Sequence, residues 1–203
     1  MMSMSEVEQT LAYYDTHAAS FVERTGQVAF SSMQEAFAAH IPSGGRILDL
    51  GCGSGRDSQA FLARGFQVVA VDGSAVLCEL ASQRIGQKVL HATFQTYEPQ
   101  GTFDGIWACA SLLHLEIPVI CQVLQNISPH LRMGGCYYLS FKYGTFSGMR
   151  HGRYFTDMTE DRFQMILQRV PELQMLEQYQ TEDVRPARKG ERWLNVFLKK
   201  GDA

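Results

Sequence analysis

The feature of this sequence that most constrains its fold is a glycine-rich segment, residues 51–55, which lies between an apolar run and an amphipathic one. Residues 46–50 have the length and composition of a buried strand, and residues 56–64 form a helical pattern that Gly65 closes. Glycines in such a loop let the backbone turn sharply and approach a ligand closely, while the first helical turn offers unpaired N–H groups. The segment therefore predicts a ligand site at the carboxyl end of a strand.

The rest of the chain continues this alternation of strand and helix patterns. Further strands are predicted at residues 66–71, 89–92, 103–110, 136–141, 173–179 and 193–199. Further helices are predicted at residues 32–41, at 75–83 after a cap at Ser74, from Pro118 to Ile127, and from Thr159 to Pro171. Ser32 and Glu35 have the spacing of a capping box. Strands that alternate with helices predict a parallel sheet covered on both faces.

Length and composition favour one globular domain. The chain has 203 residues, 45% of them hydrophobic, and no apolar run approaches the roughly 20 residues that span a bilayer. Glu6, Glu8 and Asp15 stand where a signal peptide would be basic or apolar, so we expect a cytoplasmic protein that does not contact membranes. Five cysteines without metal-site spacing predict free structural thiols and no metal, with one catalytic thiol as the alternative.

The residues around the glycine loop indicate which nucleoside it binds. Asp72 follows the loop by about 20 residues at the end of the next predicted strand, where a carboxylate accepts ribose hydroxyls. The dinucleotide fingerprint requires a glycine at position 56, where this chain has Arg56. Asp49 would repel a pyrophosphate but attract a sulfonium or ammonium group. The pattern therefore favours S-adenosylmethionine over NAD, and a NAD-dependent oxidoreductase is disfavoured.

Four segments resemble the motifs of the class I S-adenosylmethionine-dependent methyltransferases. Residues 47–55 (ILDLGCGSG) resemble motif I, residues 71–74 the second motif, and residues 103–107 followed by 112–114 the fourth. Residues 131–135 resemble the turn into the fifth strand. The resemblance covers about residues 10–200 in the family's order, and the loop is similar to that of the tellurite-resistance methyltransferases, within a small bacterial subgroup.

The resemblance implies a fold and a division of the chain. The implied fold is a doubly wound, Rossmann-like α/β sheet of seven strands with helices on both faces. Its strands are mostly parallel, with an antiparallel last strand at residues 193–199. Residues 1–203 would form a single methyltransferase domain. It would comprise an N-terminal helical lid segment (1–41), a cofactor-binding core (42–141), and a substrate-side segment with a terminal β-hairpin (142–203).

The resemblance also implies S-adenosyl-L-methionine as the cofactor and S-adenosyl-L-homocysteine as its product. The implied cofactor-binding residues are Tyr14, Asp49, Gly51, Cys52, Gly53, Asp72, Gly73, Ser74, Phe94 and Gln95. Asp72 would hold the ribose, while Phe94 and Gln95 stand at the adenine position, where the family usually has a carboxylate. Tyr14 belongs to a segment similar to the family's lid, for which a simple packing helix is the alternative.

His114 is the candidate general base, because it follows the fourth predicted strand near the expected position of the methyl group. A base is needed only when the methyl acceptor carries a proton that must leave. Since the Leu-Leu-His segment is common in the family across different substrates, a structural or substrate-shaping role for His114 is the alternative.

The late part of the chain predicts an acceptor site for an anion. Residues 142–200 carry 11 basic and 8 acidic side chains, whereas the whole chain has a net charge of −3. The candidate substrate-binding residues are Lys142, Tyr143, Arg150, Arg153, Tyr154, Arg185, Arg188 and Trp193. Arginine suits bidentate capture of carboxylate or phosphate. The alternative is that these charges are solvated loop residues and the aromatic residues belong to the core.

These features together predict a methyltransferase that acts on a small, anionic acceptor by in-line displacement. One alternative is a non-catalytic S-adenosylmethionine-binding regulatory module, and another is a methyltransferase that acts on RNA or protein. Nucleic acid is disfavoured as a partner, because the basic segment lacks the dense cations and stacked aromatics of a nucleic-acid groove. The sequence gives no indication of the oligomeric state.

Overall fold

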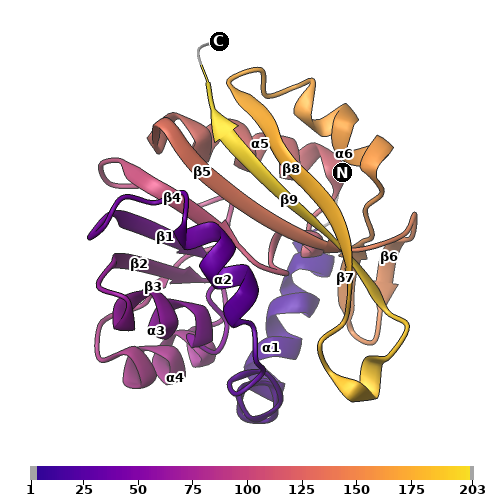
Figure 1. Cartoon of the computed structure of the whole chain (residues 1–203). Helices are drawn as coiled ribbons and strands as arrows, with labels where there is room; N and C mark the ends of the chain where they lie inside the picture. The colour runs from indigo at the N-terminus through magenta and orange to yellow at the C-terminus, as the bar shows by residue number, and fades with distance from the viewer. Residues whose placement is uncertain (1–3, 202–203) are drawn as a thin grey trace.

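A mixed β-sheet forms the centre of the computed structural model, which describes residues 4–201 (Figure 1). Its strands are β1 (Arg46–Leu50), β2 (Gln67–Asp72), β3 (Leu90–His91), β4 (Phe103–Ala108), β5 (Leu131–Lys142), β8 (Leu173–Glu182) and β9 (Arg192–Lys200). Their order in the seven-stranded sheet is β3-β2-β1-β4-β5-β9-β8. The pairs among β1 to β5 are parallel, whereas β9 runs antiparallel to both β5 and β8. The expected fold class, including the reversed last strand, is confirmed.

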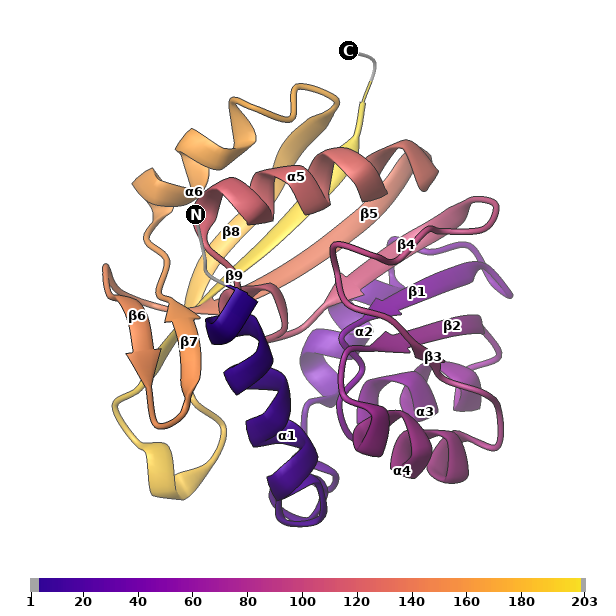
Figure 2. The same cartoon turned by 180° about the vertical axis from the view of Figure 1, so that it is seen from behind.

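Helices cover both faces of the sheet (Figures 1 and 2). The helices packed on one face are α2 (Ser31–Ala38), α3 (Arg56–Ala63) and α4 (Ala75–Ile85), and those on the other are α5 (Ile117–Ile127) and α6 (Glu160–Leu167). Because neighbouring residues of a strand point to opposite faces, β4 supplies Ile106 to the core under α5 and Trp107 to the core under α2 and α3. Trp107 stacks on Tyr138 of β5 at 4.1 Å between ring centroids.

The long helix α1 (Met4–Thr25) lies at the carboxyl ends of the central strands, outside the helices that cover the two faces of the sheet (Figure 2). Figure 2 shows α1 between helix α4 and a two-stranded hairpin, formed by β6 (Ser147–Arg150) and β7 (Arg153–Thr156), and contacts with both are present. The helix α1 therefore connects α4, beside the first strands of the sheet, to the β6–β7 hairpin, which follows β5. None of the helices within residues 4–201 is long and apolar enough to cross a membrane.

The predicted helices and strands are all present, but several boundaries differ; α6, predicted to reach Pro171, ends at Leu167, and β4, predicted to reach residue 110, ends at Ala108. The capping box is wrong, because α2 begins at Ser31 after Phe30, which makes no side-chain cap, and it ends at Ala38. The third strand has two residues only. The fifth strand begins at Leu131 and passes through the glycine pair, where Gly134 has a φ of +73°. The caps at Ser74 and Thr159 are confirmed, since each side chain accepts a backbone N–H three residues on.

The β6–β7 hairpin was not expected from the sequence. Its turn consists of His151 and Gly152, with φ values of +52° and +76°. Two successive positive φ values are typical of the tight hairpin turns that match the twist of the flanking strands. The hairpin follows β5 directly, so it places the basic residues of this segment at the carboxyl edge of the sheet.

Candidate functional site

One cavity of about 870 Å³ lies at the carboxyl ends of β1, β2, β4 and β5. Three parts of the chain line it: helix α1, the loops after the central strands, and a late wall formed by the β6–β7 hairpin and the loop between β8 and β9. The β6–β7 hairpin and the loop between β8 and β9 lie side by side in both views of the molecule (Figures 1 and 2). A volume near the upper end of the ~300–1,000 Å³ typical of ligand pockets leaves room for a nucleoside and a second small molecule.

The glycine loop approaches the cavity with its backbone, as its composition predicts. Gly51 has a φ of +87°, and a Cβ added there would lie 2.5 Å from Cβ of Ser111. Gly53 has a φ of +54° and faces the ring of Phe21. A side chain at either position would meet both a strained backbone and a steric clash. At these two glycines the wall of the cavity therefore consists of backbone atoms.

Asp72 ends β2 on the cavity wall, with its carboxylate fixed from both sides. Oδ2 accepts the N–H of Gly53 at 2.8 Å, and Oδ1 accepts the N–H of Ser74 at 2.9 Å. Burial raises the pKa of Asp72, and these backbone hydrogen bonds oppose the rise. A carboxylate has about four acceptor positions, so a carboxylate that accepts the N–H groups of Gly53 and Ser74 can still accept the two hydroxyls of a ribose.

Helix α1 covers the loop and is attached to both sides of the cavity. Asp15 accepts a hydrogen bond from the hydroxyl of Ser74, which lies at the start of α4. The hydroxyl of Thr10 accepts the N–H of Tyr154 in β7 at 3.0 Å. Leu11 lies directly over Gly73, where a Cβ would approach its side chain to 2.8 Å. The segment that resembles a lid is therefore a helix that closes one side of the cavity.

His114 lies in the short 3-10 helix η1 (Leu112–His114) after β4, in a buried position between α1 and β7. Its Nδ1 is 2.6 Å from the carbonyl oxygen of Tyr154, and its Nε2 is 2.7 Å from the hydroxyl of Tyr14. Because a carbonyl only accepts hydrogen bonds, Nδ1 carries the proton, and Nε2 accepts the O–H of Tyr14. Burial lowers the pKa of His114 to about 3, and the charge of Arg153 contributes to the shift. His114 is therefore neutral near pH 7.

The ionisation state of His114 gives a first prediction. In ¹⁵N-histidine NMR spectra, His114 is expected to stay in the neutral, Nδ1-protonated tautomer at every pH well above 3 at which the protein is folded. The reason is that protonation would place a second cation beside Arg153 in a buried site. Titration of His114 near pH 6.5 would contradict this assignment.

All five basic residues proposed for the acceptor site line the cavity, but four of them are already paired with carboxylates. The pairs are Lys142 and Arg188 with Glu191, Arg150 with Asp157, and Arg185 with Asp183. Burial alone would raise the pKa of Asp183, but hydrogen bonds from Arg185 and Trp193 hold it at about 2. These pairs order the late wall, and the three carboxylates offset three of the four positive charges.

Arg153 differs from the other four, since it has no carboxylate partner among residues 4–201. Its guanidinium lies over the rings of Tyr13 at 4.5 Å and Phe155 at 5.0 Å. Its Nη1 donates to the hydroxyl of Tyr14 at 3.3 Å, and its buried Nε has no hydrogen-bond partner. Arg153 is thus a cavity-lining cation with unused hydrogen-bond donors.

The structure places three of the predicted site residues outside the cavity lining: Asp49, Ser74 and Tyr154. Ser74 is buried as the cap of α4. Tyr154 is buried, and its neighbour Phe155 lines the cavity instead, because consecutive residues of a strand point to opposite sides. The remaining predicted residues line the cavity, so the structure brings them together. The ends of β5 and β9 add Ser140 and Asn195, which the sequence patterns did not single out.

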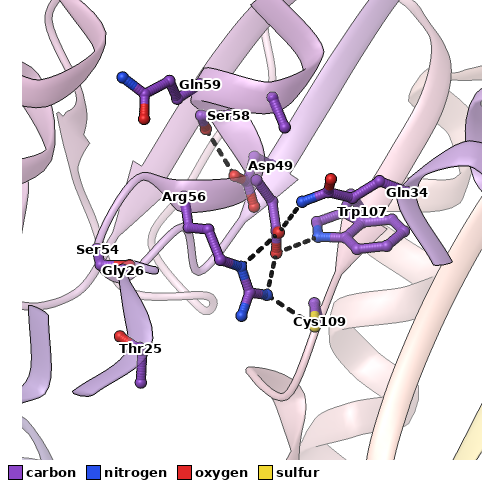
Figure 3. Close-up of polar contacts among 12 residues, drawn as sticks. Thr25, Gly26, Gln34, Asp49, Ser54, Arg56, Ser58, Gln59, Trp107 and Cys109 are labelled. Atoms are coloured by element: carbon purple, nitrogen blue, oxygen red, sulfur yellow. Dashed lines mark hydrogen bonds and ion pairs between the residues drawn. The ribbon is translucent and has the colours of Figure 1, made fainter. Parts of the chain in front are cut away.

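Asp49 is buried at the end of β1, near Ser58 and Arg56 of α3 (Figure 3). The carboxylate of Asp57 is also buried, and its charge acts on Asp49. Ser58 donates to Asp49 at 2.6 Å. Asp57 accepts hydrogen bonds from Gln34 at 2.6 Å, from Trp107 at 2.9 Å and, through both oxygens, from Arg56. Burial and the charge of Asp57 raise the pKa of Asp49 to about 8. This cluster ties the end of β1, which precedes the glycine loop, to the helix α3 that follows the loop.

A second prediction follows from this raised pKa. The unfolded chain loses the Asp49 proton near pH 3.8, whereas the folded chain keeps it until about pH 8, so the free energy of unfolding falls as the pH rises through this window. Asp49→Asn is expected to remove that part of the slope in urea titrations at several pH values. Asp104→Asn is the control, because the pKa of Asp104 is lowered and its carboxyl is ionised in both states above pH 3.8. Equal slopes for wild type and Asp49→Asn would contradict the prediction.

Comparisons with known proteins agree with this geometry. Residues 47–135 match the family model of a methyltransferase domain. The chain is 30% identical over 116 residues to the magnesium-protoporphyrin O-methyltransferase of Rhodobacter capsulatus, covering 53% of this chain and 52% of that protein. It is 31% identical over 138 residues to the cypemycin N-terminal methyltransferase of a Streptomyces species, covering 65% and 54%. The chain spans about half the length of the curated relatives it matches.

Solved structures share the fold over most of the chain. The 1,6-didemethyltoxoflavin-N1-methyltransferase of Burkholderia thailandensis superimposes with a TM-score of 0.78 at 22% identity, covering 100% of this chain and 92% of that chain. TehB of Haemophilus influenzae superimposes with a TM-score of 0.68 at 15% identity, covering 89% and 65%. Identities this low establish the fold. Together with the methyltransferase-domain match at residues 47–135, they show that the chain has the fold of the S-adenosylmethionine-dependent methyltransferases and is similar to them in the part that carries the glycine loop.

Proposed function

We propose that the protein transfers a methyl group from S-adenosylmethionine to a small, anionic acceptor by in-line displacement. The observation that carries the proposal is that one cavity joins the glycine loop and Asp72 to the unpaired cation Arg153. The two ends of the cavity differ in chemistry. The first end, at the glycine loop and Asp72, offers backbone atoms and a carboxylate, whereas the second end, at Arg153, offers aromatic rings and cations. A nucleoside cofactor and an anionic acceptor would then occupy one continuous space.

The residues at the first end fit S-adenosylmethionine. A ribose needs a fixed acceptor, which Asp72 supplies, and close backbone approach, which Gly51 and Gly53 supply. Phe94 and Gln95 line the same end and offer an aromatic face and an amide to the adenine. The relatives support this choice, because the structures of the Burkholderia enzyme and of the N-methyltransferase NodS from Bradyrhizobium japonicum contain S-adenosylhomocysteine.

The chain's own residues would contribute alignment and exclusion of water. When bound, the cofactor supplies a methyl group activated by its sulfonium, so the protein needs no covalent chemistry. Leu11 and Phe21 of α1 cover the loop and keep solvent from it. Tyr14 and Phe155 place aromatic rings at the border of the two ends, where they would stabilise a positive sulfur by cation–π attraction. Holding a nucleophile in line with the methyl group contributes several kcal/mol or more to catalysis.

The acceptor end favours a small molecule with an anionic or acidic group. Arg153 has no carboxylate partner among the described residues, whereas Lys142, Arg150, Arg185 and Arg188 each contact a carboxylate. The hairpin and the loop between β8 and β9 form one wall of the cavity, which favours an acceptor small enough to enter it. The names of several relatives indicate small-molecule acceptors, such as 1,6-didemethyltoxoflavin, whereas cypemycin N-terminal methyltransferase is named for an N-terminus.

The experiment that tests the proposal uses S-adenosylmethionine labelled in its methyl group. The protein is incubated with a cell extract, which is then divided into small-molecule, protein and nucleic-acid fractions. Label in the small-molecule fraction, above that of an Asp72→Ala control, is the expected result. Label in protein or RNA would overturn the acceptor class. No label in any fraction, with S-adenosylhomocysteine still bound, would favour a regulatory module.

Arg153 gives a third prediction. Arg153→Met is expected to raise the KM of the isolated acceptor about ten- to a hundredfold, because a hydrogen bond from a charged group contributes roughly 1.5–3 kcal/mol. The affinity for S-adenosylhomocysteine is expected to stay within a few-fold, as measured by calorimetry. Arg132→Met, which removes an exposed cation paired with Asp104 far from the cavity, is the matched control. An unchanged KM for Arg153→Met would remove Arg153 from the acceptor site.

A further inference from the structure

The hydroxyl of Tyr14 lies between two residues that restrict its direction. Its proton points to Nε2 of His114 at 2.7 Å, because Nδ1 of that ring donates to the carbonyl oxygen of Tyr154 at 2.6 Å. Arg153 approaches the same oxygen with Nη1 at 3.3 Å. All three side chains line the cavity. His114 therefore fixes the proton of Tyr14, and the ring of His114 is itself held against Phe155 at 4.8 Å between centroids.

This arrangement determines what Tyr14 can offer to a ligand. Since its proton is engaged by His114 and one lone pair accepts from Arg153, the Tyr14 oxygen presents only its second lone pair to the cavity. The two Nη atoms of Arg153, which cannot accept, carry further N–H donors on the same part of the wall. A hydrogen-bond acceptor and a donor thus stand next to each other on the cavity wall. A group complementary to both carries a hydrogen for Tyr14 and a lone pair for Arg153.

His114 is blocked as a direct base by the same contacts. Its Nε2 is occupied by Tyr14, and its Nδ1 already bears a proton. Both ring nitrogens of this buried imidazole are therefore engaged within the protein, and neither is open to a ligand. The ring is consequently suited to positioning the hydroxyl of Tyr14.

We propose that Tyr14 and Arg153 form a selective contact for an acidic hydroxyl or N–H group of the acceptor, with His114 as the positioning residue that keeps Tyr14 a hydrogen-bond acceptor. This inference rests on the proposed function and specifies its acceptor: the atom to be methylated still carries a hydrogen when it binds. When an acceptor atom with one hydrogen bonds to the methyl carbon, the bond between that carbon and the sulfonium breaks and the acceptor's proton is released to solvent, so the lone pair of Tyr14 loses its partner. The contact therefore distinguishes the unmethylated acceptor from its methylated product.

Phenol and anisole are suitable probes, because they differ only by the methyl group on the oxygen. Their binding to the protein saturated with S-adenosylhomocysteine is measured by ligand-observed NMR titration. Wild type is expected to bind phenol about tenfold more tightly than anisole, the effect of one satisfied buried hydrogen bond. In Tyr14→Phe, the preference is expected to fall below about twofold, because the accepting oxygen is absent.

Variants of His114 separate a positioning role from a general structural one. In His114→Ala the Tyr14 proton is released toward the cavity, so anisole is expected to gain affinity relative to phenol. In His114→Gln, a side-chain oxygen can again accept from Tyr14, and the preference for phenol is expected to return. A loss of packing alone would weaken both probes equally in all variants. Calorimetry with S-adenosylhomocysteine checks that each variant keeps its fold.

The outcomes separate this inference from the proposed function. Equal affinities for phenol and anisole in wild type, or no binding of either probe, would overturn the inference. If the same protein still binds S-adenosylhomocysteine, the proposed function stands. Failure of wild type to bind S-adenosylhomocysteine would instead overturn the proposed function. A preference that persists unchanged in Tyr14→Phe would assign the selectivity to another residue and would also overturn the inference.

Discussion

Asp72→Ala is expected to weaken the binding of S-adenosylhomocysteine at least about a hundredfold in calorimetric titrations. The carboxylate of Asp72 accepts the N–H groups of Gly53 and Ser74 and has free lone pairs toward the cavity. Hydrogen bonds to a charged group contribute roughly 1.5–3 kcal/mol each, and the two ribose hydroxyls would lose theirs together. The N–H of Gly53 would also lose its acceptor, which would loosen the glycine loop at this residue.

The matched control for this variant is Asp15→Ala. Asp15 is a nearby carboxylate that also bonds to Ser74, but it does not line the cavity. Its removal is expected to change the affinity by only a few-fold. Asp72→Asn keeps an oxygen for the backbone and is expected to lie between the other two variants. If Asp72→Ala binds as tightly as wild type, the cofactor does not contact this end of β2.

Asp57→Ala is expected to lower the free energy of unfolding by about 3 kcal/mol, because it leaves a buried arginine without its partner. Asp57 accepts from Arg56 at 2.8 Å, and the side chains of the pair are only 20% and 9% exposed. The indole N–H of Trp107 and the amide of Gln34 lose their acceptor at the same time. Urea unfolding at constant pH measures the effect.

The control pair is Arg64 with Glu35, whose contact at 3.2 Å lies at the surface. Glu35→Ala is expected to change stability by less than about 1 kcal/mol, as is usual for exposed pairs. The double variant Arg56→Met/Asp57→Ala is expected to be less destabilised than Asp57→Ala, since the unpaired charge is removed along with its partner. A double variant that is less stable than Asp57→Ala would contradict the explanation.

The cofactor end of the cavity could be predicted because its determinants are close together in the sequence. The glycines of the loop require positive φ angles, and Asp72 follows them at a fixed distance imposed by one helix and one strand. These are constraints of local backbone geometry, which spacing reports directly. The strand order itself needed the family resemblance, because periodicity does not reveal which strand runs antiparallel.

The acceptor end depends on contacts that spacing does not report. Tyr14 and His114 are 100 residues apart, and only the folded chain shows that their hydroxyl and ring nitrogen meet. The choice between Tyr154 and Phe155 depends on the orientation of a hairpin that the residue pattern does not indicate. The pairing of four cations with three carboxylates likewise depends on loop conformation. Sequence composition therefore predicted a charged wall but not which of its charges is free.

The position of β9 between β5 and β8 has a consequence for synthesis on the ribosome. Strand β8 leaves the exit tunnel before β9, yet within the sheet its hydrogen-bonded neighbour is β9. The nascent chain can pair β1 to β5 while β8 still waits for a partner with its edge unprotected. The half that carries the glycine loop therefore assembles first, and the late wall with Trp193 and Asn195 is added when β9 inserts. Chaperones that shield exposed strand edges would act on this protein in that interval.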